Sequence, residues 1–152
     1  MMKRNKPNIV ISPKYLPIVT EDSRYFVVTG GRGSSKSFSI TSILTMLTCQ
    51  SGHTILFTRY TMVSTHISII PEFLEKIEIM GLEDMFTITK SEIINLQTGS
   101  KILFRGIKSA SGDQTANLKS LQGITCWIIE EAEEIVSEDI FDKIDLSVRQ
   151  KG

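Results

Sequence analysis

The stretch Gly30-Gly31-Arg32-Gly33-Ser34-Ser35-Lys36-Ser37 decides the fold of this chain. It follows the apolar run Tyr25-Phe26-Val27-Val28, which predicts a buried strand. It precedes an apolar-periodic stretch from Phe38 to Leu47, which predicts a helix. A strand, a glycine-rich turn and a helix, in this order, are what a phosphate-binding loop needs. The sequence therefore predicts a phosphate-binding loop over residues 30–37.

This loop meets the consensus G-x-x-x-x-G-K-[ST] at Gly30, Lys36 and Ser37. We expect consecutive backbone N–H groups at the start of the helix to surround the β-phosphate, aided by the helix macrodipole. Lys36 would reach the β- and γ-phosphates, and the Ser37 hydroxyl would lie on Mg²⁺. The predicted nucleotide-binding residues are Gly30, Gly31, Arg32, Gly33, Ser34, Ser35, Lys36 and Ser37.

Ser35 occupies the place of the second consensus glycine. A Cβ there has an energetic cost if the backbone needs a positive φ, and it crowds the phosphate. A flexible turn of glycines and serines is the alternative interpretation. That alternative does not explain why a buried-type strand runs directly into the turn, so the phosphate-binding loop is favoured.

The composition is that of one globular domain. The chain has 152 residues, of which 41% are hydrophobic, and this is enough to build a core. Its 17 basic and 17 acidic residues balance, so the overall charge gives no sign of nucleic-acid binding. Local basic patches on the surface are still compatible with this balance. Cys49 and Cys126 lack metal-ligand spacing and are expected to be buried thiols. The sequence shows no secretory signal and no run of transmembrane length, which favours a soluble cytosolic protein.

The expected elements predict an α/β fold, in which a mainly parallel sheet has helices on both faces and an antiparallel hairpin extension. The apolar run 54–58 lacks alternation, which is typical of a buried parallel strand. Thr98-Gly99-Ser100 joins two strand-like runs and predicts a hairpin, and Pro71 should kink or divide the helix that contains it. The expected strands are 9–11, 25–28, 54–58, 85–89, 92–96, 101–105 and 125–129, and the expected helices are 36–49, 63–80 and 138–150.

A second chemical motif follows the last expected strand, where Trp127-Ile128-Ile129 runs into Glu130-Glu131. Two carboxylates at the carboxyl end of a buried strand are costly unless they meet a cation or serve chemistry. In phosphate-loop enzymes the first acid holds Mg²⁺ through water, and the second orients and deprotonates the attacking water. These roles fall to Glu130 and Glu131. The alternative is a plain acidic turn, which the strongly apolar strand makes the weaker interpretation.

Three other features leave alternatives open. Tyr15 either stacks on an adenine or is a surface tyrosine in a turn. Arg59 comes directly after an expected strand, at the edge where open α/β sheets bind ligands, so it contacts phosphate or a neighbouring subunit, or is simply solvated. The polar segment 106–117, which contains Lys108 and is followed by Lys119, is expected to be a surface loop rather than a contact to a phosphate backbone.

A glutamate after the Mg²⁺ acid, and a strand between the loop and the acids, point to the additional-strand, catalytic-glutamate branch of phosphate-loop ATPases. The combination resembles the ATPase domain of the large terminase subunit of tailed bacteriophages, the DNA-packaging motor. The resemblance runs from about Tyr25 to Gly152. It is carried by loop 30–37, Phe104-Arg105-Gly106, Leu118-Lys119-Ser120-Leu121, Gly123 and Trp127-Ile128-Ile129-Glu130-Glu131-Ala132.

This resemblance implies ATP as substrate, Mg²⁺ as cofactor, and hydrolysis that drives double-stranded DNA into a procapsid. It also implies a homo-oligomeric ring on the portal protein, a small terminase subunit as partner, and a location in the bacterial host cytoplasm at the procapsid. Arg32 matches the family's additional loop arginine, which is proposed to stabilise charge at the γ-phosphate. The catalytic residues would then be Glu131, Lys36 and Arg32, with Arg59 and Arg105 as alternatives for an arginine finger.

Members of the family continue with a coupling motif and a ribonuclease-H-like nuclease domain, and their next strand lies between the loop strand and the acid strand. We therefore divide the chain into an N-terminal, partly irregular segment, 1–24, and a partial ATPase domain, 25–152. Our hypothesis is that this chain alone binds nucleotide weakly and hydrolyses little. Two other functions stay open: a non-catalytic nucleotide-binding fragment, and another phosphate-loop ATPase that acts on nucleic acid.

Overall fold

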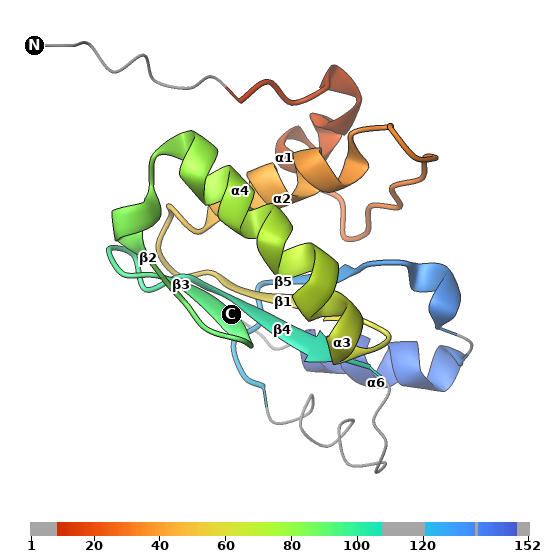
Figure 1. The fold of residues 1–152 in the computed structure, drawn as a ribbon. Coiled ribbons are helices and arrows are strands. Elements are labelled where there is room, and N and C mark those ends of the chain that lie inside the picture. The colour runs from red at the N-terminus through yellow and green to blue at the C-terminus, as the bar shows by residue number, and fades with distance from the viewer. Residues whose placement is uncertain (1–8, 108–120, 136, 149–152) are drawn as a thin grey trace, which may run out of the picture.

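A mixed five-stranded sheet forms the centre of the computed structural model, which describes residues 9–107, 121–135 and 137–148. Three strands, β4, β1 and β5, run parallel to one another, whereas β2 and β3 are antiparallel to their neighbours. Because parallel and antiparallel pairings are equally frequent, the sheet is mixed rather than mainly parallel as predicted. In sheet order the strands are β2 (Phe86–Ile88), β3 (Glu92–Asn95), β4 (Lys101–Gly106), β1 (Thr54–Arg59) and β5 (Cys126–Ile129) (Figure 1).

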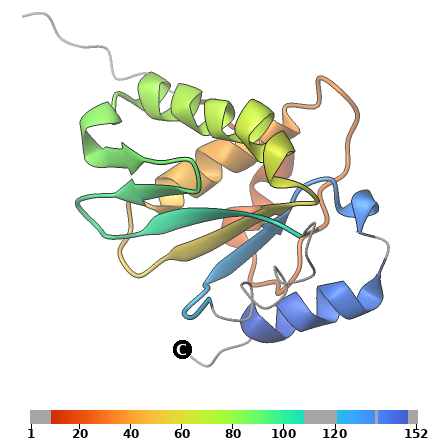
Figure 2. The same cartoon turned by 60° about the horizontal axis from the view of Figure 1, so that its bottom comes forward.

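Helices cover both faces of this sheet, as predicted. Helices α2 (Lys36–Leu47) and α4 (Ile70–Met80) lie on one face, and α6 (Glu138–Val148) lies on the other (Figure 2). Successive side chains of a strand point to opposite faces, so β1 contributes to two cores. Phe57 packs in the core beneath α2 and α4, whereas Leu56 packs with Ile144 of α6. Both cores are apolar, which explains why β1 reads as a continuous hydrophobic run.

The helical segment after β1 is divided, as Pro71 predicted. It consists of α3 (Met62–Ser64), a π-helical turn (Thr65–Ile69) and α4, in whose first turn Pro71 lies. A proline is tolerated in a first turn, because its missing N–H has no intrahelical partner there. The π-helical turn inserts an extra residue and changes the direction of the following side chains. Ile67, which lies on this turn, is 74% exposed.

Most of the remaining expected elements are present, with two corrections near the chain's ends and turns. Residues 9–11 form no strand, and a 3₁₀ turn (Pro13–Tyr15) and α1 (Pro17–Thr20) follow them, because prolines favour the first turn of a helix over a ladder. Cys49 is exposed rather than buried, since it lies beyond the end of α2 at Leu47. Neither Cys49 nor Cys126 forms a disulfide. Predictions for residues 1–8, 108–120 and 149–152 fall outside the described residues. No helix of the described part is long and apolar enough to cross a membrane.

The expected strand at 25–28 is wrong. These residues have no regular secondary structure, and Val27 is 88% exposed. No strand of the described ranges lies beside them, so their backbone groups have no ladder partners. Instead, Tyr25 and the preceding Arg24 contact α6, where both side chains donate to Asp145 Oδ1 over 3.1 Å. The same sheet ends at β5, which pairs with β1 alone among the described strands.

One core substitution tests the packing of β1. Ile55 is fully buried, so Ile55→Val is expected to lower the free energy of unfolding by about 0.5–1.5 kcal/mol. Ile67→Val removes the same methyl group from a side chain that is 74% exposed, and its effect should stay within about 0.5 kcal/mol. Urea unfolding followed by circular dichroism measures both. Equal losses in the two variants would contradict this placement of the core.

Candidate active site

Loop 30–37 makes a tight turn that leads directly into α2. The Ser34 N–H donates to the Gly31 carbonyl over 3.2 Å, and α2 begins at Lys36. Gly33 has a φ of +79°, which favours glycine, and a Cβ on Gly30 would lie 2.8 Å from Ser34 Oγ. Ser35 has a φ of 56°, so the place of the second consensus glycine does require a left-handed backbone. A serine bears this strain here, and its hydroxyl donates to the Ser34 carbonyl over 2.7 Å.

Lys36 lies across this loop. Its Nζ donates to the Gly30 carbonyl over 2.9 Å, so the ammonium group closes the loop on itself. Its positive charge is one of the influences that lower the pKa values of Glu130 and Glu131. Lys36 therefore acts electrostatically on residues that are more than ninety positions away in the sequence. Gly31, Arg32 and Ser37 are exposed on the same loop.

Glu130 and Glu131 follow β5 directly and differ in their surroundings. The Glu130 N–H continues the ladder by donating to the Thr58 carbonyl over 2.9 Å, and its side chain is only 24% exposed. Burial raises the pKa of Glu130 to about 7, although the nearby Arg59 opposes this. Glu131 lies in the turn after β5 and has a φ of 51°. Its side chain is 45% exposed. A hydrogen bond from Arg59 lowers the pKa of Glu131 and keeps its carboxylate ionised.

Arg59 is the residue that joins the acids to the rest of the site. Its Nη2 lies 2.7 Å from Glu131 Oε2, and its Nη1 donates to Ser68 Oγ over 3.1 Å. Its Nε lies 3.9 Å from Glu130 Oε2, too far for a hydrogen bond, and both of these buried atoms lack a hydrogen-bond partner. The sequence placed Arg59 at the correct edge but did not indicate that it contacts the acids. The contact depends on β1 and β5 being parallel neighbours whose carboxyl ends meet, and this pairing is seen only in the structure.

Tyr15 and Arg105 have other contacts than the sequence suggested. Tyr15 is 4% exposed, and its hydroxyl donates to the Ser34 carbonyl over 2.8 Å. It is therefore neither a surface tyrosine nor exposed for stacking on a base, but a support beneath loop 30–37. Arg105 is the second-last residue of β4, where its Nη1 donates to the Phe104 carbonyl over 2.8 Å and to the Ser91 carbonyl over 3.2 Å.

The chemistry of the acids fits a divalent cation. Glu130 Oε2 is a buried, hard oxygen atom without a hydrogen-bond partner, and such an atom calls for an explanation. A cation would stabilise the charged form that burial disfavours. Among the described residues, no group of three or more His, Cys, Asp or Glu side chains could hold a metal by itself. Mg²⁺ needs no such group, since it commonly keeps several waters and binds one or two protein oxygens plus phosphates.

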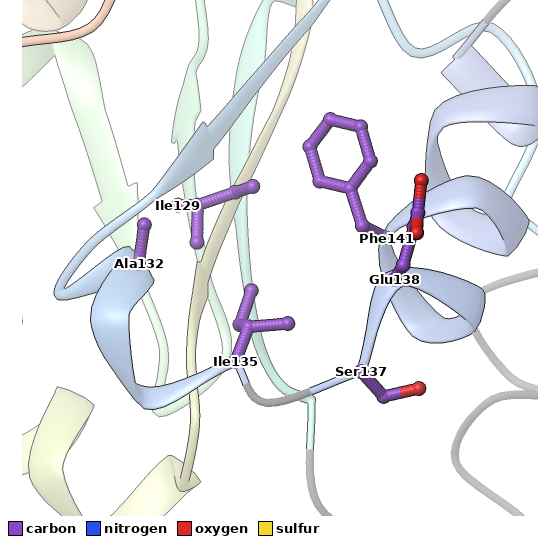
Figure 3. A pocket seen from close by; sticks show the side chains of 6 residues that line it. All are labelled: Ile129, Ala132, Ile135, Ser137, Glu138 and Phe141. Carbon is purple, nitrogen blue, oxygen red and sulfur yellow. The ribbon is translucent and has the colours of Figure 1, made fainter.

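A separate apolar pocket of about 310 Å³ lies between the end of β5 and α6 (Figure 3). It is lined by Ile129, Ala132, Ile135, Ser137, Glu138 and Phe141. None of the predicted nucleotide-binding, catalytic or metal residues lines it. The pocket therefore contributes nothing to the candidate site.

Comparison with known protein families shows which family the chain belongs to. Residues 22–152 match the phage terminase large subunit family. The chain belongs to this family. All the predicted site residues lie inside the matched region of this terminase chain, whereas Tyr15 lies before it. No curated protein matches the sequence.

The fold of this terminase chain is also that of a solved relative, the large terminase from a thermophilic bacteriophage. The two structures superimpose with a TM-score of 0.71 at 11% sequence identity. The similarity covers 95% of this chain and 37% of the thermophilic phage terminase. At this identity the likeness concerns the fold alone. This chain thus spans little more than a third of the length of that relative.

Proposed function

We propose that this terminase chain binds Mg·ATP at loop 30–37 and hydrolyses it, as the ATPase part of a DNA-packaging motor. The observation that carries the proposal is the buried Glu130 Oε2 atom at the end of β5, which lacks a hydrogen-bond partner and on which the charge of Lys36, at the start of α2, acts. A cationic loop beside two carboxylates at the carboxyl edge of a sheet suits a phosphate bound with a divalent cation. Within this proposal, the fold is a phosphate-loop NTPase of the additional-strand, catalytic-glutamate branch.

The proposed binding step replaces contacts within the loop by contacts to phosphate. Backbone N–H groups of loop 30–37 surround the β-phosphate, and Lys36 exchanges the Gly30 carbonyl for β- and γ-phosphate oxygens. Ser37 and Glu130 would hold Mg²⁺. The bound Mg²⁺ supplies charge neutralisation at the β- and γ-phosphate oxygens. Arg32, exposed on the loop, stabilises the negative charge that develops at the γ-phosphate.

The proposed hydrolysis uses Glu131 as the general base. Its ionised carboxylate accepts a proton from water as the water oxygen attacks the γ-phosphorus, and the bond to the β–γ bridging oxygen breaks. ADP and inorganic phosphate leave, and the proton passes from Glu131 to solvent. The low pKa of Glu131 means that the base is ionised at neutral pH.

The partners proposed for this ATPase follow from the family. They are double-stranded DNA, the portal protein, the small terminase subunit and further copies of the chain in a ring, in the bacterial host cytoplasm at the procapsid. What supports them is membership of the phage terminase large subunit family. Stimulation of ATP hydrolysis by procapsid–portal complexes, and not by free single-stranded DNA, tests these partners against another phosphate-loop ATPase that acts on nucleic acid.

A second function, a nucleotide-binding chain that does not turn over by itself, is favoured by one observation. Residues 25–28, which lead into the loop, lie outside the sheet, so the loop lacks a strand that fixes its position. One experiment with two measurements distinguishes the two functions. Calorimetric titration with Mg·ATP reports binding, and single-turnover phosphate release with protein in excess reports hydrolysis. Binding with phosphate release supports the ATPase, whereas binding without release supports the second function.

The support that Tyr15 gives to the loop leads to a prediction for nucleotide affinity. Tyr15→Phe removes only the hydroxyl that bonds the Ser34 carbonyl. We expect the affinity for Mg·ATP to fall about 2- to 10-fold, as for the loss of a hydrogen bond worth about 0.5–1.5 kcal/mol. Tyr25→Phe removes a hydroxyl that bonds Asp145 instead, and it should leave the affinity unchanged. Calorimetric titration compares the two, and equal losses would show that the effect is not transmitted through Ser34.

A further inference from the structure

Lys76 is a buried charge that the proposed mechanism does not use. It lies on α4, and its side chain is only 1% exposed. Its Nζ donates to Glu75 Oε2 over 2.9 Å and lies 3.6 Å from Glu72 Oε2. Burying a charge is costly even when it is paired, and an apolar side chain of similar volume in its place is often as stable or more stable. Stability alone therefore does not explain why α4 carries a lysine at this position.

The ammonium group of Lys76 also contacts α2, which packs against α4 on the same face of the sheet (Figure 1). Its Nζ lies 4.5 Å from the centroid of the Phe38 ring. An aromatic face attracts a cation, and the attraction is strongest where water is excluded, as it is around this lysine. Phe38 directly follows Ser37 in the first turn of α2. The contact therefore reaches the part of α2 that carries proposed nucleotide-binding residues.

The start of α2 makes such a contact useful. Within the described part of the chain, the side chain of its N-cap residue, Ser35, makes no capping hydrogen bond, which suits N–H groups that would surround a phosphate. The Thr41 hydroxyl donates to the Ser37 carbonyl over 2.7 Å, but this bond lies within the helix and cannot fix where the first turn lies relative to the sheet. The contact of Lys76 with Phe38 comes from another helix, so it can fix that position without occupying the N–H groups.

A second route from Lys76 to the site is electrostatic. Burial raises the pKa of Glu130 to about 7, and the negative charge of Glu72 adds to this rise. Lys76 pairs with Glu72 and so offsets part of that charge. The Glu72 side chain is 37% exposed, however, so water weakens this influence. The geometry therefore favours the route through the Phe38 ring.

We propose that Lys76 is a positioning residue for the nucleotide site, and that it acts by holding the Phe38 ring. The first turn of α2 is thereby kept in place, so that Lys36 and Ser37 meet the phosphates and Mg²⁺. This inference rests on the proposed ATPase function and deepens it. Lys76 itself contacts neither nucleotide nor metal in this role, and its two glutamate partners stabilise the ammonium group between the helices.

The test is a double-mutant cycle in the affinity for Mg·ATP, measured by calorimetric titration of the 152-residue chain. Lys76→Met keeps an unbranched side chain and removes the charge, and it is expected to weaken binding about 3- to 10-fold. Phe38→Leu removes the ring and should weaken binding by a similar factor. In the Phe38→Leu background, Lys76→Met should have no further effect. Lys76→Arg keeps a cation for the ring, so its affinity should stay within about twofold of that of the unmodified chain.

Thermal unfolding separates this role from a purely structural one. Lys76→Met should unfold at the same temperature as the unmodified chain or at a higher one, because an apolar side chain replaces a buried charge and both glutamates left behind are partly exposed to water. A lower unfolding temperature that accompanies the loss of affinity would contradict the proposal. Adding Glu72→Gln to Lys76→Met tests the electrostatic route, and it should not restore the affinity.

A matched control lies on the opposite face of the sheet. Lys143 of α6 pairs with Asp139 four residues earlier, as Lys76 pairs with Glu72, but its side chain is 43% exposed. Lys143→Met removes the same charge and should leave the affinity for Mg·ATP unchanged. An equal loss in Lys143→Met and Lys76→Met would mean that ATP responds to the overall charge of the chain, and the role of Lys76 would fail.

The possible outcomes separate the two levels of the account. If the unmodified chain does not bind Mg·ATP, the proposed function fails, and the role of Lys76 fails with it. If the chain binds Mg·ATP but the effects of Lys76→Met and Phe38→Leu multiply independently, only the positioning role fails. An unchanged affinity in Lys76→Met, or an affinity that Glu72→Gln restores, also overturns that role.

Discussion

Glu131→Gln is expected to lower the rate of ATP hydrolysis by about 10²- to 10⁴-fold, which is the usual contribution of a general base. Glutamine keeps the size and the backbone of the residue but cannot accept the proton of the attacking water. Binding of Mg·ATP should persist, because loop 30–37, Lys36 and Glu130 are unchanged. The measurement is single-turnover release of phosphate from radiolabelled ATP with protein in excess, together with calorimetric titration of Mg·ATP.

The neighbouring Glu133 gives the matched control for this variant. It lies two residues further along the same turn and is exposed, and Glu133→Gln removes the same charge. Its hydrolysis rate should stay close to that of the unmodified chain. If the two variants slow hydrolysis equally, the effect comes from the net charge of the turn, and Glu131 is not the base.

Lys36→Ala is expected to weaken Mg·ATP binding by about 10- to 100-fold, which corresponds to about 1.4–2.8 kcal/mol. The variant removes the ammonium group that acts electrostatically on the two acids and that would contact the β- and γ-phosphates. It also removes the hydrogen bond to the Gly30 carbonyl, so the loop loses a contact that closes it before nucleotide arrives. Calorimetric titration at two ionic strengths measures both the loss and its electrostatic origin.

Lys90→Ala is the control for this second prediction. Lys90 is exposed in the turn between β2 and β3, at the other end of the sheet order from β5. Its removal changes the net charge equally but should leave the affinity unchanged. An equal loss in both variants would mean that ATP responds to the overall charge of the chain rather than to Lys36.

The sequence predicted those elements whose signals are local. The helix after loop 30–37, the strand at β1 and the hairpin between β3 and β4 all appear where apolar runs and turn residues indicated them. Residues 25–28 carry the same local signal and yet form no strand. A strand needs a hydrogen-bonding neighbour, and propensity cannot supply one. The contact of Tyr25 with Asp145 involves a residue 120 positions away, and the sequence gives no indication of it.

The candidate site was predicted in its parts but not in its connections. The loop residues, Lys36 and the two glutamates follow from motif spacing alone. The contact of Arg59 with Glu131 depends on β1 and β5 being parallel neighbours, and the sheet order is a tertiary property. The support from Tyr15 depends on how a proline-rich turn folds under the loop. The roles of all the loop residues, of Glu130 and of Glu131 toward ATP, Mg²⁺ and the attacking water stay predictions.

The central claim is that loop 30–37 and the acid pair form one Mg·ATP site, and calorimetric titration of the 152-residue chain tests it most directly. The account predicts saturable binding of one Mg·ATP per chain, weak in affinity. Binding should be lost or at least about tenfold weaker in Lys36→Ala and retained in Glu131→Gln. Absence of binding by the unmodified chain, or equal binding by the chain and Lys36→Ala, would contradict the account.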